Sequence, residues 1–203
     1  MNIIDSKFYG LVEKFANLLI LNALWLICSL PILTIGPATS AMLSVVRQWK
    51  LHEDTSSVRN FFRYFKENFR YSFIIGLFFL GYSVILFFNL FYLNQDQSGL
   101  KIIMLIPLLV ITFFILCLSA YIFPIISHYK LSFKKTIQNA FFMSIYYFPT
   151  TILLFLLFFL LAMLVKYVPI LLLVIFSSGG LIQFSLCYRV FEKIGASYEE
   201  VNI

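Results

Sequence analysis

The stretch YSFIIGLFFLGYSVILFFNLFYL, from Tyr71 to Leu93, decides the fold of this chain. It contains no Asp, Glu, Lys, Arg or His, and it is longer than the ~20 apolar residues that an α-helix needs to cross ~30 Å of hydrocarbon. Four further stretches share both properties: residues 15–35, 102–127, 140–165 and 167–188. The sequence therefore predicts an all-α bundle of five transmembrane helices, with short interfacial helices between some of them.

The composition agrees with a single membrane domain. Hydrophobic residues make up 62% of the chain and charged residues only 12%, about half the share of ~25% in soluble proteins. The longest polar stretch, residues 47–70, is too short for a separate soluble domain, so residues 1–203 form one integral membrane domain. Cys28, Cys117 and Cys187 fall within the predicted spans, where we expect apolar packing rather than a disulfide framework.

Lys and Arg are distributed unevenly between the two sides of the predicted bundle. Of the 15 basic residues, eleven lie in the loops 47–70 and 128–139 and in the tail after residue 188. Because Lys and Arg accumulate in short cytoplasmic loops, this side is expected to be cytoplasmic. With five spans, the N-terminus is then outside the cell membrane and the C-terminus is in the cytoplasm.

One segment leaves the number of crossings open. The chain is apolar almost continuously over residues 15–46, which is too long for one straight span, and PILTIGPATSA (residues 31–41) interrupts it. Pro31 disrupts the first helix, and Gly36-Pro37 predicts that a helix begins again there. Residues 37–49 are too short to span. They either lie at the cytoplasmic interface or fold back as a re-entrant segment, which would place the N-terminus inside and give six crossings.

The interrupted segment is also a candidate functional motif. Its residues are Pro31, Thr34, Gly36, Pro37 and Ala38. Small residues and glycine at this point indicate a close helix crossing. The alternative is an anion site, because the free N–H groups at the start of a helix attract negative charge.

A second candidate lies in the first cytoplasmic loop. Val58, Phe61, Phe62, Phe65 and Phe69 recur at helical spacing, and a basic stripe runs beside them: Arg59, Arg63, Lys66 and Arg70. Ser56 or Ser57 can serve as the N-cap. This pattern is typical of an interfacial amphipathic helix that binds anionic lipid head groups. The same surface, with Arg59, Phe62, Arg63, Phe65, Lys66, Phe69 and Arg70, is the candidate docking site for a partner protein.

Motifs for chemistry are absent from the sequence. The two histidines, His52 and His128, lie in separate loops, and no clustered carboxylates, phosphate-binding loop or nucleophile motif accompanies them. We therefore expect no enzyme activity, no metal and no cofactor. The net charge of +6 is explained by cytoplasmic loops rather than by nucleic-acid binding. Spans without ionisable groups also disfavour ion-coupled transport.

The first third of the chain resembles a known family. The pattern consists of Asn22, Leu24-Trp25-Leu26, Leu30-Pro31, residues 34–38, Arg47, Phe61-Phe62 and residues 66–69. It is similar to the YesL-like family of bacterial multi-pass membrane proteins. This family is defined by domain of unknown function 624. The resemblance implies a protein of the bacterial cell membrane. The genes of the family commonly lie near genes for carbohydrate import by ABC transporters. The resemblance implies no catalytic residues.

Two functions follow as expectations. The first is an accessory or regulatory partner of a carbohydrate uptake system of the ABC type, which would bind transporter subunits. The alternative is a small transporter or channel that acts as a homo-oligomer on an uncharged solute, since an uncharged solute needs no intramembrane charge.

Overall fold

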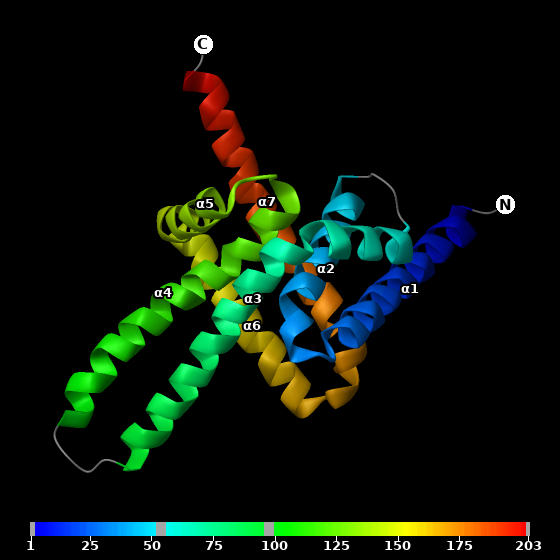
Figure 1. Cartoon of the computed structure of the whole chain (residues 1–203). Helices are drawn as coiled ribbons and strands as arrows, with labels where there is room; N and C mark the ends of the chain where they lie inside the picture. The colour runs from blue at the N-terminus through cyan, green and yellow to red at the C-terminus, as the bar shows by residue number, and fades with distance from the viewer. Residues whose placement is uncertain (1–2, 52–55, 96–99, 202–203) are drawn as a thin grey trace.

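The computed structural model describes residues 3–51, 56–95 and 100–201, and throughout these ranges the chain is helical with short connections. The prediction of an all-α bundle is therefore confirmed. Figure 1 shows the arrangement of the elements, whose bounds are α1 (Ile3–Ser29), η1 (Ile32–Thr34), α2 (Ile35–Lys50), α3 (Ser57–Gln95), α4 (Leu100–His128), α5 (Phe133–Tyr146), α6 (Phe148–Tyr167), η2 (Pro169–Leu173) and α7 (Ile175–Val201).

Four of the described helices are long and apolar enough to cross a membrane. The apolar segments are Val12–Ser29, Ser57–Tyr92, Ile103–His128 and Phe148–Tyr167. They lie in α1, α3, α4 and α6, and they match four of the five predicted spans in order. The structure thus agrees with a membrane protein.

Prolines shift the bounds of the last two predicted spans. The predicted span 140–165 is divided between α5 and α6, because Pro149 lies in the first turn of α6 and its ring excludes a continuous helix through Tyr147. The predicted span 167–188 begins instead with the 3₁₀ turn η2 at Pro169, and α7 starts only at Ile175. Both predicted ranges were therefore wrong in their bounds.

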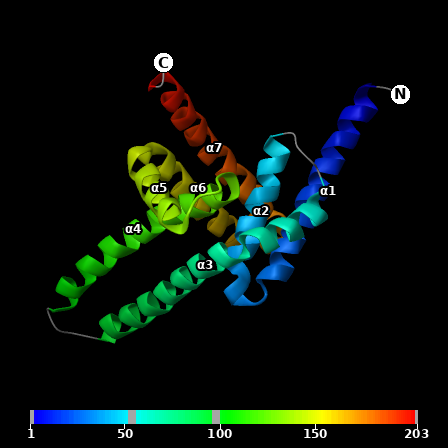
Figure 2. The same cartoon turned by 45° about the horizontal axis from the view of Figure 1, so that its top comes forward.

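The predicted break at residues 31–41 is present, although the new helix begins slightly earlier than expected. The turn η1 follows Pro31, and α2 starts at Ile35 rather than at Gly36-Pro37. From this turn α2 runs back along α1, and Figures 1 and 2 show the two chain termini at the same end of the bundle. The six-crossing alternative expects both termini on one side, whereas the five-span arrangement expects them on opposite sides, and the number of membrane crossings stays a prediction. Which end faces the cytoplasm stays a prediction.

The folded-back helix α2 forms the centre of the bundle. It contacts α1, α3, α4 and α7, and most of its residues are buried, from Gly36 to Gln48. Its apolar side chains form one core cluster with Leu21, Phe61 and Phe184. A second cluster joins α4 to α5, α6 and α7 around Tyr121 and Ile125. A helix buried on this scale is part of the core, not an interfacial helix.

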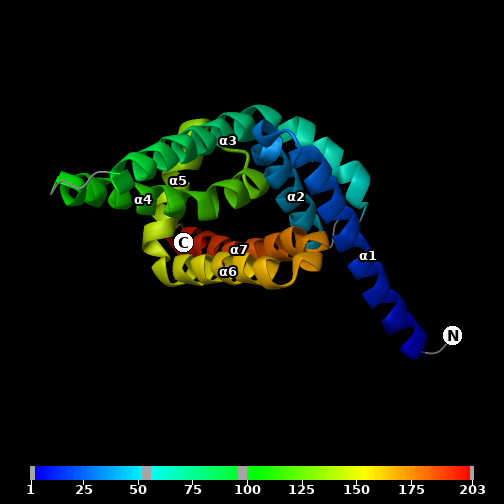
Figure 3. The same ribbon diagram turned by 90° about the horizontal axis from the view of Figure 1, so that it is seen from below.

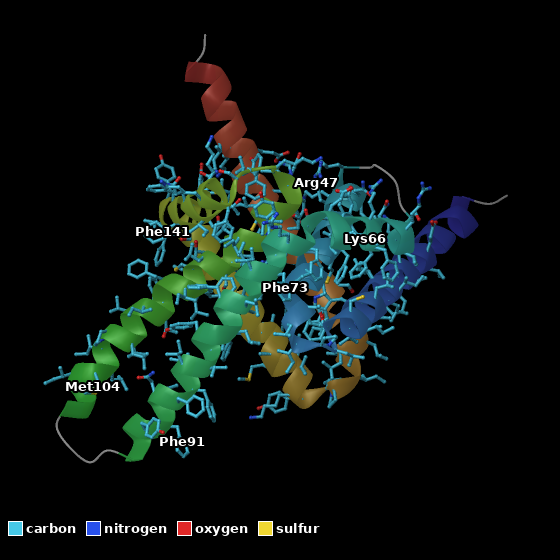
Figure 4. All side chains as sticks on the ribbon, viewed as in Figure 1. Arg47, Lys66, Phe73, Phe91, Met104 and Phe141 are labelled. Carbon is cyan, nitrogen blue, oxygen red and sulfur yellow. The ribbon has the colours of Figure 1, made fainter. Side chains whose placement is uncertain are left out.

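The predicted amphipathic helix is not a separate element. Residues 57–70 are the first part of α3, which continues as one helix to Gln95. Figure 4 shows that α3 bends between Lys66, on the basic part, and Phe73, on the apolar part. In the view from below, α3 curves around the outside of the bundle (Figure 3). The basic part therefore continues directly into the span.

Candidate functional site

Gly36 lies where α2 crosses α3 with direct contact between the two backbones. A methyl group on Gly36 would overlap the carbonyl oxygen of Ser72 and would lie 3.1 Å from the Cα of Gly76. A methyl group on Gly76 would in turn lie 3.3 Å from the Cα of Gly36. Small residues allow such an approach in membrane bundles, where packing replaces the hydrophobic driving force. At position 36 only glycine fits without displacing α3.

The other residues of this motif also have packing roles. The hydroxyl oxygen of Thr34 lies 2.6 Å from the carbonyl oxygen of Cys28, which belongs to the unpaired last turn of α1. Pro37 and Ala38 are buried in the core, whereas Pro31 is exposed. Because the N-terminus of α2 faces the backbone of α3, the arrangement favours the packing interpretation. Anion binding at this motif stays a prediction.

Asn22 joins the first helix to the last. Its side-chain amide donates to the carbonyl of Leu172, at 2.7 Å, and its side-chain oxygen accepts from the N–H groups of Phe176 and Ser177, at 3.1 and 3.2 Å. The hydroxyl of Ser177 donates to the carbonyl of Leu18 at 2.9 Å. The first N–H groups of α7 have no partner within their own helix, so fully buried Asn22 caps α7 from α1.

Gln183 compensates for a proline in α4. Pro124 has no N–H, so it leaves the carbonyl of Ala120, four residues earlier, without its helical partner. The side-chain amide of Gln183, on α7, donates to this carbonyl at 3.0 Å. Both groups are buried, and in hydrocarbon a backbone carbonyl must find a partner within the protein. This contact therefore links α4 to α7 at the proline.

The basic part of α3 presents its cations outward and packs its other face on α1 and α2. Phe61 is fully buried, Ser57 donates to the side-chain oxygen of Asn17 at 3.0 Å, and the amide of Asn68 donates to the hydroxyl of Ser44 at 3.2 Å. The candidate docking residues Arg59, Phe62, Arg63, Lys66, Phe69 and Arg70 are exposed, and Phe65 is half-buried. The structure thus brings all seven onto one helix at the same end of the bundle.

At the same end of the bundle, Arg47 packs against the end of α4. Its guanidinium donates to the carbonyl of Ser127 at 3.4 Å, a favourable place for a cation because the last carbonyls of a helix are unpaired. His128 stacks on Phe191 with ring centres 5.0 Å apart. Burial, with a smaller effect from Tyr188, raises the pKa of the neighbouring Tyr129. His52, the other histidine, lies outside the described residues.

Two of the cavities between the described helices are large enough for a small molecule. The first, of about 610 Å³, is lined by α1, α2 and α7 and is named here the α1–α7 cavity. Its lining includes Lys14, Trp49, Lys50 and Ser185. The second, of about 490 Å³, is almost entirely apolar and lies between α1, α2, α6 and α7. Trp25 and Phe176 stack along it with ring centres 4.2 Å apart.

Within the described ranges, no three His, Cys, Asp or Glu side chains are grouped so that they could hold a metal ion. The polar side chains described above join helices to one another. The fold and these contacts together define a multi-pass helical membrane protein whose buried polar groups join its helices.

The comparisons with known proteins agree with this class. The sequence profile of the family described as "Protein of unknown function, DUF624" matches residues 18–90. The chain is 33% identical to "Uncharacterized protein YesL" of Bacillus subtilis (strain 168) over 61% of its own length and 60% of that protein. It is 27% identical to "Uncharacterized protein YesV" of the same organism over 68% of each chain. No solved structure matches the chain significantly. These matches confirm the resemblance to the YesL-like family.

The matched region contains most of the contacts described above. Asn22, Gly36, Arg47 and Phe61 all lie within residues 18–90, and each joins two helices. Gln183 lies outside this region, and no motif in the sequence singles it out. Pro124 was the available signal, because a proline within an apolar helix requires a donor from elsewhere.

Proposed function

We propose that this protein is a non-enzymatic membrane subunit that binds a cytoplasmic or membrane partner through the basic part of α3. The observation that carries the proposal is the separation of two faces on residues 57–70. One face holds the segment on α1 through Ser57 and on α2 through Phe61 and Asn68. The other presents exposed Arg59, Arg63, Lys66 and Arg70, and no ion pair involving them occurs within the described residues.

Arginine and aromatic side chains are the residue types that contribute most to protein interfaces. Phe62 and Phe69 are 45% and 36% exposed, so two aromatic rings lie beside the four cations. The α3 surface would thus offer apolar area and positive charge together. The gene neighbourhood implied for the YesL-like family supports a carbohydrate importer of the ABC type as the partner system.

Affinity purification from the native membrane in mild detergent tests this proposal. We expect permease or ATPase subunits of a carbohydrate importer to co-purify with the protein, and to be lost in the triple variant Arg59→Ser, Arg63→Ser, Lys66→Ser. The matched control is Lys130→Ser, Lys134→Ser, Lys135→Ser, which removes three exposed cations near the start of α5 and should retain the partner. Equal recovery by both variants would contradict the proposal.

The alternative function is a small transporter or channel for an uncharged solute. It is favoured by the apolar cavity of about 490 Å³ lined by Trp25 and Phe176, since aromatic faces bind uncharged solutes. Reconstitution of the purified chain into liposomes distinguishes the two functions. A homo-oligomer without other subunits that moves labelled sugar would establish the alternative and overturn the first proposal.

A further inference from the structure

We propose that the α1–α7 cavity binds one anionic phospholipid, with its phosphate held by Lys14 and Lys50 and its chains against the apolar wall. This site is separate from the docking surface on α3 and does not depend on the function proposed above. Three features carry the inference: the shape of the cavity, the unpaired donors around it and its opening toward the apolar surface of the bundle.

The cavity lies in the wedge between the first and last helices. Figures 1 and 2 show α1 and α7 diverging toward the two chain ends, with α2 between them. A volume of about 610 Å³ is within the range of ~300–1,000 Å³ usual for small-molecule sites. Gly10 lines this wedge, and a methyl group on it would have no atom within 4 Å. There is therefore open space beside α1 here.

The polar groups of the cavity are mainly donors without partners. The ammonium groups of Lys14 and Lys50 form no ion pair or hydrogen bond with the described residues. Lys50 lies 5.3 Å from the ring centre of Tyr188, a contact that leaves its N–H groups free to donate. The indole N–H of Trp49 is buried and has no partner among the described residues. A buried donor of this kind is costly unless a ligand or water accepts its proton.

The charge of these groups selects an anion. Lys14 and Lys50 carry two positive charges, and Glu13, which also lines the cavity, carries one negative charge. A phosphate diester has one negative charge and two oxygens that accept from ammonium or indole N–H groups. It therefore matches both the remaining positive charge and the unpaired donors.

The rest of the cavity favours a lipid over a free anion. Leu18, Val46 and Leu181 form an apolar wall, and Leu181 is itself 37% exposed on the surface of α7. The wall therefore continues onto the exposed apolar surface of α7. A free phosphate would leave this wall without a partner, whereas the acyl chains of a phospholipid would cover it.

Native mass spectrometry of the purified full chain in detergent provides the test. The probes are phosphatidylglycerol, phosphatidylcholine with the same acyl chains, and inorganic phosphate. We expect one phosphatidylglycerol to be retained at least fivefold more tightly than phosphatidylcholine, and excess inorganic phosphate not to displace it. Equal retention of both lipids, or displacement by inorganic phosphate, would overturn the proposal.

Two variants locate the lipid in the cavity. Lys14→Gln with Lys50→Gln removes both cations, and Gly10→Leu fills the open space beside α1. Each should weaken phosphatidylglycerol binding at least fivefold, while the control Lys134→Gln with Lys135→Gln on α5 should leave it unchanged. Unchanged binding in both cavity variants would show that the lipid binds elsewhere.

A measurement with the cavity intact guards against loss of folding in these variants. With Trp25→Phe, Trp49 becomes the single tryptophan of the chain. Phosphatidylglycerol with bromine on its acyl chains should quench the fluorescence of Trp49 at lower lipid concentration than brominated phosphatidylcholine does. Equal quenching by the two lipids would contradict a phosphate site at Lys14 and Lys50.

Discussion

At the scale of single residues, the contact between α2 and α3 depends on the absence of a side chain at position 36. Gly36→Ala places a methyl group against the carbonyl oxygen of Ser72. Because α3 must move to admit it, we expect a loss of about 1–3 kcal/mol in stability, the usual cost of overpacking. Thermal unfolding of the purified protein in detergent measures this loss.

The control for this substitution is Gly81→Ala, also in α3. Gly81 is exposed, and a methyl group there would have no atom within 4 Å. We expect its unfolding temperature to be unchanged or slightly higher, because alanine favours the helix over glycine by about 0.5–1 kcal/mol. If both variants unfolded at the same temperature, the close approach at Gly36 would not limit stability.

Asn22 provides a second prediction at this scale. Asn22→Leu removes the acceptor for the N–H groups of Phe176 and Ser177 and the donor to the carbonyl of Leu172. Each buried polar group left without a partner costs about 1–3 kcal/mol, so a marked fall in unfolding temperature is expected. Asn89→Leu is the control, since exposed Asn89 bonds only to a carbonyl of its own helix. An equal effect of both changes would refute the role of Asn22 in holding α7.

These residue contacts show what the sequence can and cannot predict. A glycine between prolines indicated a break and a close crossing, and both are present at Gly36. The partners of Asn22 are separated from it by about 150 positions in the chain, a distance over which local periodicity carries no information. The α1–α7 cavity was missed for the same reason, since its lysines come from helices whose relative direction was not known.

At the scale of helices, the contact between α4 and α7 yields a prediction with an internal control. Gln183→Leu leaves the carbonyl of Ala120 with only the weak thiol donor of Cys187, at 3.9 Å, and we expect a loss of about 1–3 kcal/mol in the free energy of unfolding. Pro124→Ala restores a backbone N–H that bonds to the same carbonyl. In a protein that already carries Pro124→Ala, Gln183→Leu should therefore lower the free energy of unfolding by less than it does in the unchanged protein.

A double-mutant cycle on thermal or denaturant unfolding measures the difference. We expect an interaction free energy of about 0.5–3 kcal/mol between positions 124 and 183, which lie on different helices. Additive effects would mean that Gln183 contributes through packing alone and that the carbonyl of Ala120 finds another partner.

Prolines also explain which helices the sequence predicted well. The interior of α3 has no proline, and its apolar part was predicted closely. Pro107 and Pro124 lie inside α4 without ending it, whereas Pro149 and Pro169 begin new helices. The donor from Gln183 shows why α4 tolerates Pro124, and such a donor is not visible from the surrounding sequence.

At the scale of the whole molecule, the fold-back of α2 changes the expected distribution of charge across the membrane. With the N-terminus at the same end as the C-terminus, Lys7 and Lys14 join the basic side. Of the 15 Lys and Arg residues, only Lys101 and Lys166 then remain in the chain segments at the opposite end. Positive charge in short loops sets the orientation of a membrane protein. With six crossings, Lys and Arg are distributed more unevenly between the two sides than with five. We therefore expect both termini in the cytoplasm.

Labelling of single cysteines in intact cells tests this topology. In a background without Cys28, Cys117 and Cys187, exposed Glu13→Cys and Glu67→Cys should be protected from a membrane-impermeant maleimide, and exposed Lys166→Cys should react. All three should react once the membrane is permeabilised. Reaction of Glu13→Cys from outside with protection of Glu67→Cys would restore the five-span arrangement. It would also place Lys14 and Lys50 on opposite sides, so that no single lipid could bind both.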